Sequence, residues 1–415
     1  MRRKNSSRVW LLIVILAFMG ILALAAAAGV HSSPPEDKSS KPRITLAAYG
    51  SAAQKNIIED IARIYERDYD CTVDVYCYAT QEALYACVTS QYAAGAPFDV
   101  FYLDKRTLIR LVDGGWLYPL DDVVAQRTED GDEFYQTALI AGQRYERQYA
   151  LPTGVNPYML HYNATMLKRA GVMLPQEMLE NKTWNFDCFE DYLRAIHEHT
   201  GNPALVIENN WSTLIGWLKT VDGQFLGIDR RGDIRYDYLG ERTLDRLRDL
   251  IHKGIVAYLG DMYRGASLDH LFRSGFTPMV LADFGFMCRL YDVNWFEWDI
   301  APMPSKDSSF SNTPVDVPMV AVCARSEQPR YAADFVDFYV SAFGQQLRIE
   351  QGESLLSSLN MTFYTSMFDV RLPDHANYYF YAIEYGYTEP SMQPYLNRRE
   401  SVYEWFDHTL KAAKR

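Results

Sequence analysis

Residues 98–120 read FDVFYLDKRTLIRLVDGGWLYPL, and this stretch decides the fold class. Its first part is a largely apolar run that ends in the carboxylate of Asp104, a pattern typical of a strand buried on both faces. Asp104 then stands at the carboxyl end of that strand, and ligands of open α/β sheets bind at this edge. The remainder predicts a helix that stops at Gly114 and Gly115, after which the chain returns as Leu-Tyr-Pro-Leu. The stretch predicts a β-α unit with a carboxylate at the ligand-binding edge.

The chain before this stretch alternates between the two kinds of hydrophobic period. Residues 44–49 and 72–78 are expected as strands, and each is followed by a helix whose apolar residues recur every three or four positions. The second of these helices is expected at residues 81–94. The resulting β-α-β-α-β order predicts a parallel, doubly wound sheet.

A second α/β block follows residues 149–157, where two prolines and a glycine interrupt the alternation. Asn185 is expected to cap a helix at 186–199. The other elements are expected as strands at 158–162, 204–207, 277–281 and 317–323, and as helices at 211–221, 242–252, 268–272, 330–342 and near Asn377 and Tyr403. Two α/β blocks joined by strand crossings rich in Pro and Gly indicate two lobes with a cleft between them.

The N-terminus reads as a targeting segment. Arg2, Arg3, Lys4 and Arg8 precede an apolar run that ends in small residues near residue 30. Residues 1–30 are therefore predicted to be a signal peptide or an N-terminal transmembrane anchor, and cleavage is left open. Residues 31–42 are polar and rich in Pro and Ser, which predicts a flexible linker. Either reading places the remainder outside the cytoplasm, secreted or held at the cell surface by the membrane.

Composition and motifs exclude several classes of function. A chain of 415 residues has room for two domains, and a net charge of -12 argues against nucleic acid as a partner. The six cysteines show no spacing typical of a metal site, and export leaves their disulfide state open. We find no Ser/His/Asp order, nucleophile elbow or phosphate-binding glycine loop. The sequence therefore predicts no metal, no cofactor and no enzymatic activity.

Five segments, in order along residues 43 to about 350, carry a resemblance to a known family. They are Phe98–Leu120, Tyr149–Asn163, Lys182–Phe186, Leu271–Gly285, and Asp299–Pro304 with the helix Ala332–Phe338 after it. The chain resembles the extracellular solute-binding proteins of ABC importers, in the sugar-binding family 1 group that includes maltose-binding protein. Two features depart from the family: no lipobox cysteine is present, and Ala282-Asp-Phe-Gly285 stands where Gly-Pro-Trp is frequent.

The resemblance implies an α/β, two-lobed, periplasmic-binding-protein-like type 2 fold with hinge strands and an interlobe cleft, preceded by the N-terminal hydrophobic segment. The solute-binding domain would comprise residues 43–415. Its first lobe is expected at about 43–153 and 304–352, and its second lobe at about 157–300 and 357–415.

The resemblance also points to residues at strand ends and crossings. Tyr49 and Ser51 flank Gly50 after the first strand, where ligand contact is usual in the family, although a tight turn alone explains the glycine. Asp104 is either a ligand contact or the cap of the following helix. Asn156 falls where maltose-binding protein has a sugar-contacting acid, and its alternative is a hinge residue set by the neighbouring proline.

Aromatic residues supply the other candidates. Trp211 and Trp217 do not share a helical face, so we expect Trp211 at the cleft and Trp217 in the core. Asp283, Phe284 and Phe286 occupy the position of the family's aromatic cleft turn. Trp295 belongs to a nearby aromatic cluster with Tyr291 and Trp298, for which core packing is the alternative.

These features predict a binding protein that captures a small-molecule ligand, a sugar or oligosaccharide, and delivers it to ABC permease subunits. We expect a monomer. An aromatic content of 14% suits the C–H faces of sugars. Alternatives are a polyamine or other small solute bound on the same scaffold, an exported sensor or partner-binding protein, and, third, an enzyme acting on glycans.

Overall fold

The computed structural model describes residues 41–208, 212–213, 216–217, 225–228, 234–236, 238–259, 267–359, 372–386 and 388. The hydrophobic segment at 1–30, residues 31–40 of the linker, Trp211 and the expected helix near Tyr403 lie outside the described residues. In the parts of the chain that the structure describes, no helix is long and apolar enough to span a membrane.

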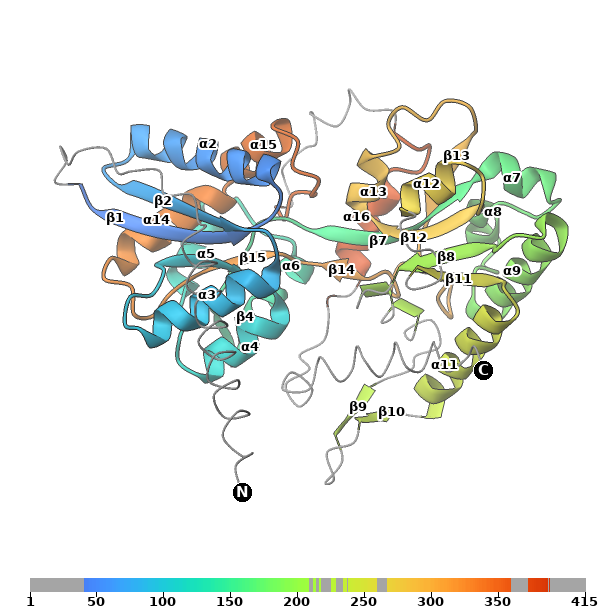
Figure 1. Ribbon diagram of the computed structural model, residues 1–415, viewed down its shortest axis with the longest axis horizontal. Helices are drawn as coiled ribbons and strands as arrows, with labels where there is room; N and C mark the ends of the chain where they lie inside the picture. Colours follow the sequence, from blue (N-terminus) through green and yellow to red (C-terminus); the bar gives the residue numbers. More distant parts are fainter. Residues whose placement is uncertain are drawn as a thin grey trace, which may run out of the picture. The chain divides into compact units, whose positions relative to one another are not determined.

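A five-stranded sheet organises the first lobe, with the order β2-β1-β3-β15-β6 (Figure 1). β1, β2 and β3 are mutually parallel, and β15 and β6 complete the sheet as antiparallel neighbours. This confirms the predicted β-α-β-α-β order. The strands are β1 (Arg43–Tyr49), β2 (Thr72–Tyr78), β3 (Val100–Leu103), β6 (Leu151–Pro152) and β15 (Met319–Val322).

Helices cover both faces of this sheet: Figure 1 shows α2 on one face and α3 on the other. The apolar stripe of α2, with buried Ile58, Ile61 and Tyr65, explains its packing against the strands. The helices of this lobe are α2 (Ala52–Asp68), α3 (Gln81–Ala93), α4 (Lys105–Asp113), α5 (Asp121–Asp130), α6 (Gln136–Ala141), α14 (Pro329–Val340) and α15 (Ala342–Glu350).

The stretch 98–120 folds as its sequence predicts. All residues of β3 are buried, and Asp104 follows directly as the N-cap of α4. The helix ends at Gly114, and Gly115 takes a φ of +68°, a left-handed conformation that other residues rarely adopt.

A second sheet, with the order β11-β8-β12-β7-β13, organises the second lobe, and β14 pairs with the first residues of β7. β11, β8 and β12 run parallel, whereas β7 runs antiparallel to β12 and β13. The strands are β7 (Asn156–Asn163), β8 (Leu205–Glu208), β11 (Val256–Leu259), β12 (Met279–Asp283), β13 (Trp298–Ala301) and β14 (Val315–Asp316).

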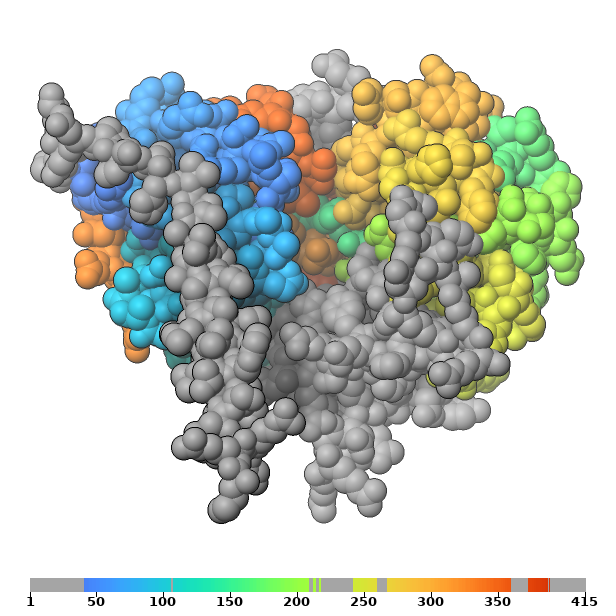
Figure 2. Space-filling model, in the orientation of Figure 1, coloured from blue at the N-terminus to red at the C-terminus, as the bar shows by residue number. Residues whose placement is uncertain are grey.

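The second-lobe helices between residues 164 and 252 pack around a separate apolar cluster that includes the fully buried Trp184 and Trp217, whereas the later helices of this lobe pack into the cluster that also forms the core of the first lobe. In the space-filling view, the helices α7 to α9 (green) and the segment from α12 to β13 (yellow to orange) both reach the surface (Figure 2). These helices are α7 (Ala164–Arg169), α8 (Pro175–Glu180), α9 (Phe186–Thr200), α11 (Tyr238–His252), α12 (Leu268–Arg273), α13 (Phe284–Cys288) and α16 (Tyr378–Tyr385).

Two small ribbons complete the described elements: β4 (Gln143–Arg144) with β5 (Arg147–Gln148), and β9 (Phe225–Ile228) with β10 (Ile234–Tyr236).

Three crossing segments connect the two sheets. The first leads from β6 to β7, the second from β14 to β15, and the third follows α15, where the structure describes its residues 351–359. β14 pairs with Pro157 and Asn156 of β7, so the second crossing begins after residue 316.

Caps explain where two helices begin. Asn185 caps α9 as predicted, since its side chain accepts a hydrogen bond from the Cys188 N–H (3.1 Å). The helix expected at about 330–342 is confirmed as α14, which ends at Val340, and a further helix that was not expected, α15, begins after Ser341. The Ser341 hydroxyl accepts from the Gly344 N–H (3.0 Å), which favours a new helix start over continuation.

Candidate ligand-binding site

Tyr49 and Ser51 lie at the carboxyl edge of the first sheet. Tyr49 ends β1, is half-buried, and meets the ring of Tyr102 edge-on at 6.3 Å. Ser51 is exposed and caps α2: its hydroxyl accepts from the Gln54 N–H (3.3 Å), while its own N–H donates to Gln54 Oε1 (2.8 Å). Gly50 has a φ of +153°, and a Cβ there would lie 2.4 Å from Gln54 Oε1. The turn therefore requires glycine whether or not a ligand binds.

Asp104 lies at the same edge and caps α4. One carboxylate oxygen accepts from the Thr107 N–H (2.8 Å), and the side chain is nearly buried at 9% exposure. The Asp104 N–H donates to the hydroxyl of Tyr85 (2.9 Å), which also accepts from Gln81 Nε2 (2.6 Å). Burial, and then the charge of Asp104, raise the pKa of Tyr85 well above its ordinary value. Tyr85 stays neutral and supports the strand end, a role that its sequence neighbours did not indicate.

Asn156 and Asp283 meet at the carboxyl edge of the second sheet. Asn156 begins β7 and Asp283 ends the adjacent, antiparallel strand β12. Asn156 Nδ2 donates to Asp283 Oδ2 (3.0 Å), and Asn156 Oδ1 accepts from the Phe284 N–H (3.0 Å). The other carboxylate oxygen of Asp283 accepts from the Phe286 N–H (3.0 Å), which caps α13. Two residues predicted separately as ligand contacts are therefore in direct contact.

Further carboxylates lie near this pair. The pKa of Tyr158 is raised well above its ordinary value, first by burial and then by the charges of Asp316, Asp283 and Glu208. Glu208 ends β8 directly after a buried apolar run. That pattern is the one that pointed to Asp104, so the same signal in the sequence could have identified Glu208.

The aromatic candidates of the turn are largely enclosed. Phe284 is 3% exposed and packs edge-on against Tyr379, with ring centroids 5.1 Å apart. Phe286 is fully buried between His161 (4.8 Å) and Phe272 (5.8 Å). In this conformation the two phenylalanines form the core beneath the Asn156–Asp283 pair.

Trp295 lies away from that pair. Its side chain is 57% exposed, and its indole N–H donates to the carbonyl of Arg273 (3.4 Å). It precedes β13, whose first residue Trp298 pairs with Asn163, at the end of β7 opposite Asn156. An eight-residue strand separates these ends by ~23 Å, so the structure does not bring Trp295 to the other candidates.

The described residues hold no group of three or more His, Cys, Asp or Glu side chains arranged to bind a metal ion. The site consists of carboxylates, an amide and tyrosines at the carboxyl edges of two sheets that crossing strands connect. Such an arrangement can accept and donate hydrogen bonds to a polar ligand, and it defines a two-lobed solute-binding protein.

Comparison with known proteins agrees with this class. A family model described as bacterial extracellular solute-binding protein matches residues 44–346. The chain belongs to that family, which confirms the predicted resemblance and places the protein outside the cytoplasm. A sequence relative is the arabinooligosaccharide-binding protein of Bacillus subtilis (strain 168), 27% identical over 180 residues. The match covers 42% of this chain and 39% of that relative, less than half of either.

Solved structures with the same fold confirm the two-lobed α/β class. The GacH receptor of Streptomyces glaucescens GLA.O superposes with a TM-score of 0.70 at 18% identity, covering 90% of this chain and 94% of the receptor. The sugar-binding protein MalE of Xanthomonas citri gives 0.71 at 17% identity, with coverages of 89% and 92%. An ABC substrate-binding protein of Listeria monocytogenes, solved with cycloalternan, gives 0.71 at 16% identity, with coverages of 90% and 95%.

Proposed function

We propose that this protein captures a sugar or oligosaccharide between its two lobes and delivers it to an ABC permease. The observation that carries the proposal is the contact between Asn156, which begins β7, and Asp283, which ends β12, at the carboxyl edge of the second sheet. Planar amide and carboxylate groups suit the hydroxyls of a sugar, and nearby tyrosine rings suit its C–H faces. The relatives named for arabinooligosaccharide, sugar and cycloalternan binding support the same ligand class.

The hydrogen bonds at this pair leave capacity for a ligand. Each oxygen of an ionised carboxylate has two acceptor positions. On Asp283, Asn156 occupies one position of one oxygen and the Phe286 N–H occupies one position of the other. The remaining positions can accept sugar hydroxyls, and Asn156 holds the carboxylate in place while they do so. Closure of the lobes would then remove water and strengthen these bonds.

A polyamine is the second candidate, on the strength of one observation. Asp283, Glu208 and Asp316 all act on Tyr158, so negative charge is concentrated at this edge. A cation would be attracted to that charge. The ligands named for the relatives favour sugar over polyamine.

Further parts of the proposal concern assembly and anchoring. We propose that the protein acts as a monomer, binds without catalysing a reaction, and remains at the cell surface or is secreted according to the fate of residues 1–30. The lobes that bind the sugar would also carry the surface that docks on the permease.

Thermal-shift titration of the purified protein tests the ligand class. The panel would contain arabinooligosaccharides, maltooligosaccharides and cyclic glucans, with spermidine and putrescine as the cationic arm. A ligand present at 100 times its Kd stabilises the folded state by about 2.7 kcal/mol. We expect a sugar to raise the melting temperature. A shift with spermidine and with no sugar would replace the sugar proposal by the polyamine one.

A further inference from the structure

Arg348 is a fully buried cation at the root of the crossing segments. It lies on α15 with 0% exposure. One guanidinium nitrogen donates to the carbonyl of Thr153 (2.6 Å), in the first crossing. Another pairs with Glu353 Oε2 (2.6 Å), at the start of the third crossing. A single side chain therefore binds two of the three segments that join the lobes.

The second crossing is tied to the same point through Thr153. Both the N–H (2.9 Å) and the hydroxyl (3.1 Å) of Thr153 donate to the carbonyl of Pro318. Just beyond, Val155 and Leu356 exchange backbone hydrogen bonds of 2.8 and 3.0 Å, which joins the first and third crossings again. The described parts of all three segments are thus fixed beside Arg348.

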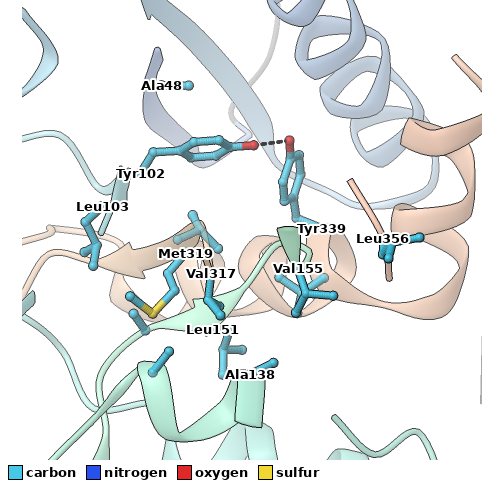
Figure 3. Close-up of a cluster of buried hydrophobic side chains, with 14 of the residues drawn as sticks. Ala48, Tyr102, Leu103, Ala138, Leu151, Val155, Val317, Met319, Tyr339 and Leu356 are labelled. Atoms are coloured by element: carbon cyan, nitrogen blue, oxygen red, sulfur yellow. Dashed lines mark hydrogen bonds between the residues drawn. The ribbon is translucent and has the colours of Figure 1, made fainter. Parts of the chain in front are cut away.

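Tyr339 connects Arg348 to the carboxyl edge of the first sheet, where Asp104 lies. The guanidinium carbon of Arg348 lies 4.4 Å from the centre of the Tyr339 ring. The Tyr339 hydroxyl hydrogen-bonds to that of Tyr102 on β3, as Figure 3 shows, and Asp104 follows at the end of that strand. Figure 3 also shows Val155 and Leu356 beside Tyr339.

Arg348 carries its charge in apolar surroundings, so the presence of this charge needs an explanation. Val155, Val317, Leu356 and Tyr339 are all buried in one apolar cluster. Burying an ion pair in such a cluster is costly, and apolar side chains of similar volume often replace buried pairs without loss of stability. An apolar side chain cannot donate hydrogen bonds to the Thr153 carbonyl and the Glu353 carboxylate as Arg348 does. Arg348 therefore serves to hold these two groups in fixed positions.

We propose that Arg348, with Glu353, is a positioning residue that sets the points from which the three crossing segments leave the first lobe. It thereby fixes the open angle between the lobes and confines their movement to the residues beyond Thr153. The inference rests on the proposed function, because it assumes that ligand capture requires closure. It predicts that loss of the pair changes the unliganded lobe arrangement even when the fold is preserved.

The test measures the distance between the lobes without ligand. Spin labels would be attached through non-natural amino acids at the exposed residues Asp122 and Glu198, one in each lobe, so that native cysteines are untouched. The variant Arg348→Met/Glu353→Met removes both charges together. We expect a melting temperature close to that of the parent protein and a broader distribution of interlobe distances. An unchanged distribution would overturn the inference.

Two further variants separate the geometry of Arg348 from its charge and from the general effect of removing an Arg–Glu pair. Arg348→Lys preserves the charge but cannot bond to the Thr153 carbonyl and Glu353 with the same geometry. This variant should fold and should still broaden the distribution of interlobe distances. A distribution like that of the parent protein would also count against the inference. The matched control is Arg246→Met/Glu190→Met, which removes an Arg–Glu pair (2.9 Å) within the second lobe. It should leave the distances unchanged.

Binding of the best sugar from the thermal-shift panel is then measured with each variant. The Arg348 variants should bind it several-fold more weakly, and the Arg246 control should bind as the parent does. If no sugar binds the parent protein, the proposed function fails, while the distance measurements still decide the inference about Arg348.

Discussion

The two sheet edges that carry the candidate site are built in different ways. At the first edge, Asp104 bonds to Thr107, three residues further on, so its position follows from local sequence. At the second edge, Asn156 bonds to Asp283, 127 residues further on, so the site exists only once β7 and β12 pair. Both carboxylates cap a helix, and Asp283 is in addition held by a side chain of another strand. We therefore expect ligand recognition to depend more strongly on the second edge.

The largest effect is expected for Asp283→Ala. The change removes the cap of α13, leaves Asn156 Nδ2 without its acceptor, and deletes a carboxylate that we assign to the ligand. Loss of a cap and of a buried hydrogen bond costs about 1–3 kcal/mol of unfolding free energy. Sugar binding should fall by about 2–3 kcal/mol, because the carboxylate is a charged acceptor. Denaturation and calorimetric titration measure the two losses, and binding within twofold of the parent protein would contradict the assignment.

A buried histidine in the second lobe makes the free energy of unfolding depend on pH. His161 on β7 is fully buried; its Nδ1–H donates to the Met159 carbonyl (3.2 Å), so Nε2 accepts from the Tyr379 hydroxyl (3.0 Å). Burial, with a smaller contribution from Arg289, lowers the pKa of His161 to about 3.

Because the unfolded chain binds this proton near pH 6.5 and the folded one does not, stability is complete above that pH and is lost as the pH falls towards 3. The loss from His161 between pH 7 and pH 5 should be about 2 kcal/mol. Denaturant unfolding at the two pH values measures it, with His161→Gln as the variant from which this part of the pH dependence should disappear. An equal slope in both proteins would refute the prediction.

Asp104→Asn separates capping from binding at the first edge. Asn and Asp cap helices about equally well, so the free energy of unfolding should change by less than about 0.5 kcal/mol. If Asp104 also accepts a ligand hydroxyl, sugar affinity should fall by about 1 kcal/mol. Comparison with Asp104→Ala, which loses both functions, isolates the cap. Unchanged affinity in the Asn variant would reduce Asp104 to a helix cap.

The smallest effect is expected for Trp295→Ala. Its indole lies at the end of β7 opposite Asn156, so sugar affinity should stay within about twofold of the parent value, or ~0.4 kcal/mol. Calorimetric titration checks this. A tenfold loss would show that the ligand extends to that end of the lobe.

Local patterns predicted the parts of the fold that depend on neighbouring residues. The buried run before Asp104, the alternation that leads to a parallel sheet, and the Asn185 cap are all visible in short windows. The end of α14 was predicted to within two residues, whereas α15 was missed, because only the serine at 341 marks its start. The pairing of β14 with β7 joins residues about 160 positions apart, so no short window of sequence contains it.

The candidate site also combines features that local sequence indicates with features that depend on residues far apart in the chain. The sequence indicated Asn156 and Asp283 by family position, but their contact comes from the register of two distant strands. Phe284 and Phe286 look alike as aromatic turn residues, and only packing against Tyr379 and His161 shows how little of them is exposed. Tyr85 escaped notice because a tyrosine on a helix is ordinarily a packing residue.

A crystal structure of the protein with the sugar that shifts its melting temperature most would show whether the Asn156–Asp283 pair binds the ligand. We expect sugar hydroxyls to bond to the Asp283 carboxylate beside Asn156, with the carboxyl edge of the first sheet, at Tyr49 to Ser51 and Asp104, closing on the opposite side. A sugar bound elsewhere, with the Asn156–Asp283 pair exposed to solvent, would contradict this expectation.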